Sequence, residues 1–310
     1  KYKTSDEEII MNMLEIENIS KRFGDKSVIK DLSLSVPNNC IFGFVGQNGA
    51  GKTTTMKMIL GLLSVDSGQI YVHGEKVEYG QNRTNQYCGY LPDVPEFYNF
   101  MNAKEYLKFC ADITEMQPSE SKARSEMLLE LVGLDKEKHR IGGYSRGMKQ
   151  RLGIAQALLN QPKLLICDEP TSALDPIGRK EILDILITAK SQTTVLFSTH
   201  ILSDVDRISD RIALLHGGKV VFSGNKDDLR RRKPAVGFEV ELENPGAVDA
   251  ILRLHTHAKR LDTLRVVFDT ATEEQMHQAI SLLIQEKIPF RKVEKSEYTL
   301  ESMFMEVVGK

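Results

Sequence analysis

The sequence contains few cysteines, no long apolar run and almost no net charge, and each shortage excludes a class of protein. The four cysteines are Cys40, Cys88, Cys110 and Cys167. No two of them form a CxxC pair, which argues against a structural zinc site and for reduced thiols in a cytosolic protein. The apolar runs, such as Ile41–Val45, are far shorter than the roughly 20 residues of a membrane-spanning helix. A formal net charge of −2 provides no field that would attract a polyanion, so we expect no nucleic-acid partner.

The remaining composition is that of a globular protein, with 41% hydrophobic and 27% charged residues. Strand-like and helix-like patterns alternate through residues 13–224, which predicts an α/β sheet domain. The polar stretch 224–235 contains a basic run, Arg230–Lys233, which we interpret as a solvated linker rather than a polyanion contact. We therefore expect a main domain over residues 13–233.

Two further segments flank this domain. Residues 1–12 are polar and acidic, lack the apolar core of a signal peptide, and are expected to be an N-terminal extension. Residues 234–310 predict a small α+β accessory domain, because VGFEVELE alternates like a half-buried strand and Thr272 with Gln275 fits a capping box. At the end of the chain, TLESMFMEVV has apolar residues at helical spacing, which we expect in the core.

The main chemical signal is GQNGAGKT over residues 46–53, which matches the phosphate-binding pattern G-x-x-x-x-G-K-[ST]. Its glycines let the backbone curl so that N–H groups point at phosphate oxygens. An apolar strand precedes the loop and a helix follows it, and the helix N-terminus adds its dipole to the anion site. Lys52 is expected to reach the β- and γ-phosphates, and the Thr53 hydroxyl to bind Mg²⁺. The residues of this loop expected to contact ATP are Gly46, Asn48, Gly49, Ala50, Gly51, Lys52, Thr53 and Thr54.

A second signal is LLICDE over residues 164–169, four apolar residues followed by two acids. The apolar run predicts a buried parallel strand, and open α/β sheets bind ligands at the carboxyl ends of such strands. Asp168 is expected to hold Mg²⁺ directly or through water, and Glu169 to polarise the attacking water. Between the two signals, YSRGMKQR places Ser145 and Gly147 at the start of a helix. They predict either a further anion site or an ordinary helix N-cap.

The motifs GQNGAGKT, YSRGMKQRLGIAQALL, LLICDEPTSALD and STH, in this order over residues 14–224, resemble those of the ATPase subunit of ATP-binding cassette (ABC) transporters. The resemblance implies a P-loop cassette of α/β fold with a helical subdomain at residues 92–160. It also implies a homodimer, or a pair with another cassette, in which two chains enclose two ATP molecules with Mg²⁺. Ser145 and Gly147 would then contact the γ-phosphate bound by the partner chain.

Three more residues take roles from the resemblance. Phe23 falls where the family stacks an aromatic ring on adenine, although a lone Phe is more often a core residue. His200 falls at the histidine that contacts the γ-phosphate, so it joins Glu169 and Lys52 as an expected catalytic residue. Asp175 falls in the loop that lies between the two chains.

The sequence departs from the family pattern at three places. The usual signature LSGGQ is replaced by Tyr144–Met148, which keeps the serine and the second glycine but has Arg146 between them. Asp93 replaces a glutamine that contacts the metal and its water, so it is a candidate Mg²⁺ ligand or, alternatively, a solvated loop acid. The third departure is the additional tail. The signature variant and the tail together resemble the branch that drives export of peptides, antibiotics or ions.

We therefore expect an ATPase that drives export through a separate integral-membrane permease, from the cytoplasmic face of the cell membrane. One alternative is a regulatory or immunity module without a permease. Glu169 and His200 argue against such a weakly active site, but Asp93 keeps this alternative open. The other is a cassette ATPase that acts on ribosomes or DNA, which the single cassette and the absence of sustained heptads disfavour.

Overall fold

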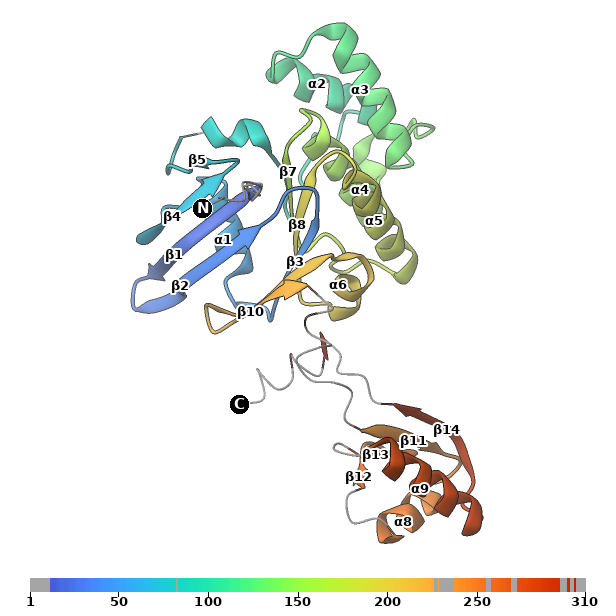
Figure 1. Ribbon diagram of the computed structural model, residues 1–310. Helices are drawn as coiled ribbons and strands as arrows, with labels where there is room; N and C mark the ends of the chain where they lie inside the picture. Colours follow the sequence, from blue (N-terminus) through green and yellow to red (C-terminus); the bar gives the residue numbers. More distant parts are fainter. Residues whose placement is uncertain are drawn as a thin grey trace, which may run out of the picture. The chain divides into compact units, whose positions relative to one another are not determined.

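The computed structural model describes residues 12–81, 83–225, 228, 237–254, 258–268, 272–295, 300–301 and 304 of the chain. The chain forms two compact units, Lys1–Asn225 and Lys226–Lys310 (Figure 1). The expected N-terminal extension, apart from Asn12, and the basic run Arg230–Lys233 lie outside the described residues.

A six-stranded sheet forms the centre of the first unit, in the order β10-β9-β3-β8-β7-β6. Its strands are β3 (Ile41–Gly46), β6 (Cys88–Leu91), β7 (Leu164–Asp168), β8 (Thr194–Thr199), β9 (Arg211–His216) and β10 (Lys219–Asn225). Neighbouring strands from β9 to β6 run parallel, and β10 is antiparallel to β9. Because β3, β7 and β8 are buried along their whole length, their sequences are largely apolar. The carboxyl ends of the parallel strands meet at one edge, from which the loops of the expected site emerge.

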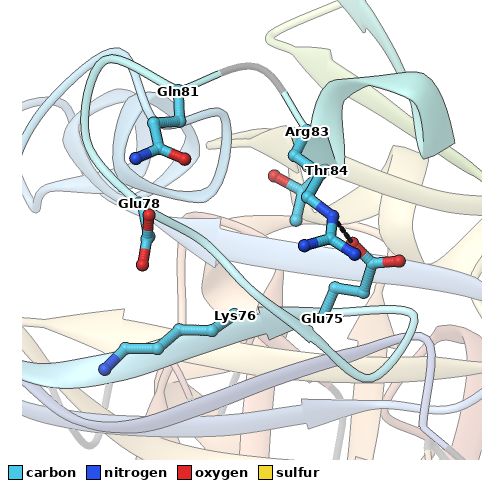
Figure 2. Close-up of a pocket in the computed structure, with 6 residues that line it drawn as sticks. All are labelled: Glu75, Lys76, Glu78, Gln81, Arg83 and Thr84. Atoms are coloured by element: carbon cyan, nitrogen blue, oxygen red, sulfur yellow. Dashed lines mark ion pairs between the residues drawn. The ribbon is translucent and has the colours of Figure 1, made fainter.

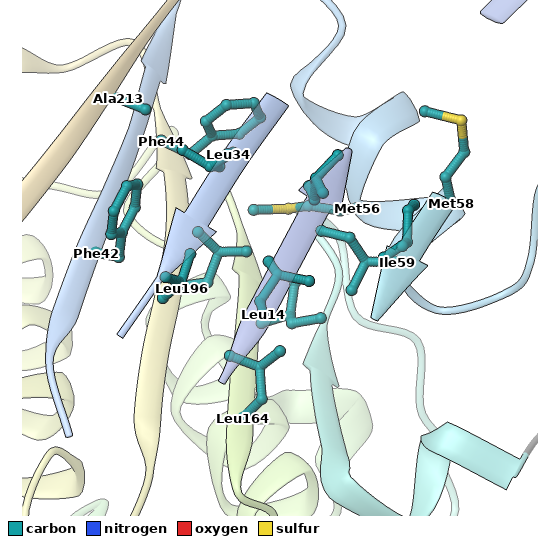
Figure 3. Close-up of a cluster of buried hydrophobic side chains, with 14 of the residues drawn as sticks. Leu14, Leu34, Phe42, Phe44, Met56, Met58, Ile59, Leu164, Leu196 and Ala213 are labelled. Carbon is teal, nitrogen blue, oxygen red and sulfur yellow. The ribbon is translucent and has the colours of Figure 1, made fainter. Parts of the chain in front are cut away.

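A second, antiparallel sheet has the order β2-β1-β4-β5. Its strands are β1 (Leu14–Phe23), β2 (Lys26–Val36), β4 (Ser67–Val72) and β5 (Glu75–Lys76). One buried cluster joins Leu14 of β1, Phe42 and Phe44 of β3, and Met56 of helix α1 (Lys52–Ile59) (Figure 3). Burial of a side chain of this size contributes about 1.5–3 kcal/mol. This core therefore fixes both β3 and α1, which flank the expected phosphate loop.

The other helices of the first unit follow α1 in the chain. They are α2 (Ala103–Ile113), α3 (Pro118–Leu131), α4 (Arg146–Leu158), α5 (Pro176–Ala189) and α6 (Leu202–Ile208), with 3₁₀ turns η1 (Arg83–Tyr87) and η2 (Ile141–Gly143). Helices α2 to α4 lie within the segment 92–160. Asn102 and Glu105 form a capping box that begins α2. Within the described ranges, no helix is both long and apolar enough to cross a membrane.

The second unit has the element order β-α-β-β-α-β. Its elements are β11 (Phe238–Leu242), α8 (Pro245–Leu254), β12 (Lys259–Arg260), β13 (Arg265–Phe268), α9 (Glu273–Gln285) and β14 (Phe290–Lys295). The antiparallel sheet order β12-β13-β11-β14 is that of a split β-α-β fold. Phe238 and Phe268 stack in its core with ring centroids 4.2 Å apart. Thr272 forms the predicted capping box with Gln275 at the start of α9.

The fold class expected from the sequence is confirmed: an α/β cassette with a helical part, followed by a small α+β domain. Of the expected terminal helix, Leu300, Glu301 and Phe304 are helical, and its other residues lie outside the described part of the chain. The sequence does not predict β12, because two polar residues are too short a run to show alternation.

Candidate active site

The loop between β3 and α1 has a backbone that only glycine adopts without strain. Gly49 has φ +80° and Gly51 has φ +110°, both in the left-handed region. A Cβ on Gly51 would lie 2.4 Å from the Ile29 side chain, and one on Gly46 would lie 2.7 Å from the carbonyl oxygen of Leu215. No side chain caps the N-terminus of α1. Its first N–H groups are therefore available to phosphate oxygens, as the motif predicts.

Lys52 is buried against this loop, with 5% of its side chain exposed. Its Nζ donates to the carbonyl oxygens of Gly46 at 2.7 Å and Gln47 at 3.2 Å. The same Nζ lies 3.0 Å from Glu169 Oε1. The ammonium is thus held above the loop and next to the acid at the end of β7.

Glu169 links the other expected catalytic residues. Its Oε2 lies 2.9 Å from His200 Nδ1, so its carboxylate has Lys52 on one oxygen and His200 on the other. The Ser198 hydroxyl donates to Asp168 Oδ1 at 2.6 Å and accepts from the Glu169 N–H at 3.0 Å. The structure therefore brings Lys52, Glu169 and His200 together and fixes Asp168 beside them.

Although Ser198 begins the motif STH, the sequence predicts no role for this residue. The register of β7 and β8 places it opposite Asp168. The sequence hint for Ser198 is that a polar side chain interrupts the apolar run of the buried strand TVLFST. A fully buried hydroxyl requires a hydrogen-bond partner, and here that partner is the site.

Two predicted Mg²⁺ ligands are carboxylates, Asp168 and Asp93, and the third is the hydroxyl of Thr53. The Asp168 side chain is almost fully buried, which suits a carboxylate that neutralises a cation. Mg²⁺ in nucleotide sites takes one or two carboxylates plus phosphate oxygens. Among the described residues, no group of three or more His, Cys, Asp or Glu could hold a metal by itself. The residues present therefore suit a Mg²⁺ ion whose remaining ligands come from the phosphate oxygens of ATP.

Asp93 lies in the loop after β6 and contacts helix α4. Its Oδ1 is 3.4 Å from Arg146 Nη2, and its backbone carbonyl accepts from Gln150 Nε2 at 2.6 Å. Burial raises the pKa of the Asp93 carboxyl, and Arg146 lowers it, while the charges of Asp168 and Glu169 raise it further. A cation bound among these acids would oppose the effect of Asp168 and Glu169 on the pKa of Asp93. The metal role of Asp93 stays a prediction.

Ser145 and Asp175 both begin helices. Ser145 caps α4, where its Oγ accepts from the Met148 N–H at 3.2 Å, and Asp175 caps α5. A Cβ on Gly147 would lie 4.0 Å from the Leu174 side chain and 4.0 Å from Ser145 Oγ, so the position is not crowded. In the part of the chain that the structure describes, Ser145 and Gly147 make no hydrogen bond to Lys52, Glu169 or His200. Their contacts with a partner chain's nucleotide stay a prediction.

Phe23 ends β1 with 49% of its surface exposed, so it is not a core residue. Lys21 Nζ lies 5.8 Å from the centre of its ring. An exposed aromatic ring at the end of β1 is available to stack on a base, and this contact with adenine stays a prediction.

A separate cavity lies at β5 and η1 (Figure 2), and its lining includes no residue of the phosphate loop or of the segment after β7. It is lined by Glu75, Lys76, Glu78, Gln81, Arg83 and Thr84. Arg83 Nε lies 3.1 Å from Glu75 Oε2. Because acidic and basic side chains both line this cavity, it does not offer the positive surroundings that nucleotide phosphates require.

Comparison with known proteins agrees with this geometry. The family described as "ABC transporter" matches residues 29–172. The chain is 36% identical over 305 residues to the uncharacterized ABC transporter ATP-binding protein YxlF of Bacillus subtilis (strain 168), covering 96% of this chain and 99% of that protein. It is 34% identical over 304 residues to the bacitracin transport ATP-binding protein BcrA of Bacillus licheniformis, covering 96% and 97% respectively.

A solved structure of the ATP-binding subunit of an ABC transporter is 32% identical, with a TM-score of 0.64 over 71% of this chain and 92% of that chain. The likeness to the curated relatives extends through both units, because it covers nearly the whole length of each protein. With the phosphate loop and the paired acids at the strand ends, these matches assign the chain: it belongs to the ATP-binding subunits of ABC transporters and is an ATPase.

Proposed function

We propose that two cassettes, either two copies of this chain or this chain and another, close around two ATP molecules with Mg²⁺ and drive export through a separate permease. The observation that carries the proposal is the carboxylate of Glu169, held between Lys52 and His200 at the carboxyl end of β7. A carboxylate in this position can accept the proton of an attacking water. The ammonium of Lys52 and the imidazole of His200 orient it, and Lys52 neutralises charge that develops on the γ-phosphate.

The contacts of Lys52 indicate how the site becomes active. Its Nζ is shared between Glu169 and two loop carbonyls. Phosphate oxygens of ATP compete for the same Nζ, so their arrival frees Glu169 Oε1 for water. Water then attacks the γ-phosphate in line, its proton passes to Glu169, and Lys52 and His200 stabilise the equatorial oxygens. Thr53 and Asp168 would hold Mg²⁺, which would supply positive charge next to the phosphates.

The signature residues support a site made by two chains. Ser145 and Gly147 lie at the N-terminus of α4, where backbone N–H groups and the helix dipole favour an anion. Within one chain they do not contact the catalytic carboxylate. A second chain that faces the first would bring them to its γ-phosphate and would place Asp175 at the contact between chains.

An exposed aromatic surface next to Asp93 supports a membrane partner. Val94, Tyr98 and Phe100 are each at least 50% exposed. The Tyr98 ring lies 5.8 Å from that of Phe100 and 5.4 Å from that of Phe109. Contiguous exposed apolar side chains mark sites of protein contact. We propose that the permease binds this surface and holds the chain at the inner face of the cell membrane.

The relative named for bacitracin transport favours an antibiotic-like peptide as the exported compound. The test is purification of the tagged chain from detergent-solubilised membranes, followed by ATPase assays in lipid vesicles. We expect a multi-span membrane protein to copurify and to stimulate hydrolysis. Tyr98→Ser with Phe100→Ser should lose this partner and keep basal hydrolysis. Leu62→Ser, at an exposed apolar residue elsewhere, is the control. Recovery of ribosomes or DNA instead, or hydrolysis that no membrane protein alters, would favour the alternatives.

A further inference from the structure

Two of the places where this sequence departs from its family are in contact with each other. Asp93 replaces the usual glutamine, and Arg146 replaces the first glycine of the signature. Although 53 residues separate them in sequence, Arg146 Nη2 lies 3.4 Å from Asp93 Oδ1. Gln150, one turn further along α4, donates its Nε2 to the carbonyl oxygen of Asp93 at 2.6 Å. One helix therefore contacts both the side chain and the backbone of Asp93.

These two contacts differ in character. Positions i and i+4 lie on the same face of a helix, so Arg146 and Gln150 both face the loop after β6. Gln150 is completely buried, and its amide anchors the backbone of Asp93. The ion pair is half exposed, with 44% of the Arg146 side chain and 46% of the Asp93 side chain accessible. Such a pair adds little to folding stability, so its value lies in orientation rather than in stability.

Arg146 also sets the direction of the Asp93 side chain. Because Arg146 Nη2 lies 3.4 Å from Asp93 Oδ1, the Asp93 carboxylate is directed toward the first turn of α4. Gln150 holds the backbone of the same residue, so the side chain and the backbone of Asp93 are both tied to α4.

We propose that the Asp93–Arg146 ion pair, supported by Gln150, is a strap that couples the two nucleotide sites of the dimer. Asp93 lies at the site of its own chain, near Asp168 and Glu169. Arg146 stands between Ser145 and Gly147, which serve the site of the partner chain. A shift of Asp93 when Mg²⁺–ATP binds is transmitted through Arg146 to the start of α4 and so to the second site. This inference rests on the proposed two-chain arrangement, and Arg146 acts in it as a positioning residue.

The experiment is a double-mutant cycle on the full chain with Asp93→Asn, Arg146→Gln and the combined variant. The rate of ATP hydrolysis is measured against ATP concentration at saturating Mg²⁺. For two coupled sites the Hill coefficient of the unmodified chain exceeds one and approaches about two. We expect Arg146→Gln to reduce it to about one with less than about a threefold change in half-saturating ATP. The combined variant should lower the Hill coefficient no further, and Arg146→Lys should restore part of it.

Lys149→Gln removes a positive charge from the same helix and is the matched control. Additive effects in the cycle, or an unchanged Hill coefficient in Arg146→Gln, would overturn the strap. So would a more than tenfold rise in half-saturating ATP for Arg146→Gln alone, which would mark a direct phosphate contact. Dimerisation is measured separately, as the ATP-dependent mass of Glu169→Gln. A chain that never dimerises refutes the proposed function, whereas a dimer with a Hill coefficient of one before mutation refutes only the coupling.

Discussion

At the scale of single residues, the position of Glu169 combines backbone strain with contacts to Lys52 and His200. Its φ of +48° is in the left-handed region, which costs a non-glycine residue about 1–2 kcal/mol. The hydrogen bond from its N–H to Ser198 helps hold this conformation. The carboxylate is thereby turned back between Lys52 and His200, rather than into solvent beyond the strand end.

Replacement of this carboxylate by an amide separates binding from hydrolysis. Glu169→Gln keeps the side-chain shape but removes its basicity and its charge. We expect ATP binding to persist, hydrolysis to fall by at least about 10²-fold, and an ATP-bound dimer to accumulate. Single-turnover hydrolysis and light scattering measure the two effects. Glu130→Gln, at an exposed acid of α3, should behave like the unmodified chain. Near-normal turnover of Glu169→Gln would remove Glu169 from the mechanism.

At the scale of elements, a buried acid connects the segment after β7 to helices α5 and α6. Asp204 of α6 accepts from the Thr171 hydroxyl at 2.6 Å and from Arg179 of α5 at 2.5 Å. Thr171 is two residues after Glu169, and Asp204 is four residues after His200. The cluster thus holds in register the two segments that present the base and the histidine.

Loss of charge at Asp204 should therefore affect both stability and catalysis. Asp204→Asn keeps the size of the side chain but weakens its bonds to Arg179 and Thr171. We expect a loss of about 1.5–3 kcal/mol in the free energy of unfolding, the range for a hydrogen bond to a charged group. Urea denaturation measures this free energy of unfolding. The rate of ATP hydrolysis should fall, whereas the affinity for ATP should remain unchanged. Asp135→Asn, at an exposed acid after α3, is the control. If Asp204→Asn hydrolyses ATP at the full rate and unfolds like the unmodified chain, the cluster does not position Glu169 and His200.

The elements of the site differ in how far the sequence predicts them. GQNGAGKT and LLICDE predict the phosphate loop and the buried strand, because glycine conformation and apolar runs are local properties. The bridge through Ser198 depends on the register of β7 with β8, and the Asp93–Arg146 contact joins segments 53 residues apart. Such long-range pairings leave no periodic pattern, so they follow only from the fold.

At the scale of the whole molecule, the described residues of the second unit form a core of their own. The stacked pair Phe238 and Phe268, with Leu283 of α9, belongs to a cluster confined to residues 238–293. A domain with an independent core can be removed without destroying the other core. Its role is then expected in assembly rather than in chemistry.

Truncation after Lys233 tests this role. ATP binding should remain nearly unchanged, because the phosphate loop, Asp168 and Glu169 all lie in the first unit. Dimerisation or association with the permease should weaken. Nucleotide titration and analytical ultracentrifugation, with circular dichroism to confirm folding, provide the readouts. A folded truncated chain that no longer binds ATP would place the tail in the site.

If each active site needs residues from two chains, mixing two inactive variants should restore activity. Lys52→Ala disables the phosphate loop, and Ser145→Arg disables the signature, so neither homodimer has an intact site. A mixed dimer contains one site with an intact loop from one chain and an intact signature from the other. We expect mixing to restore hydrolysis, and the rate of the unmodified chain to rise faster than linearly with total protein at low concentration. No recovery on mixing, with strictly linear concentration dependence for the unmodified chain, would contradict a site made by two chains.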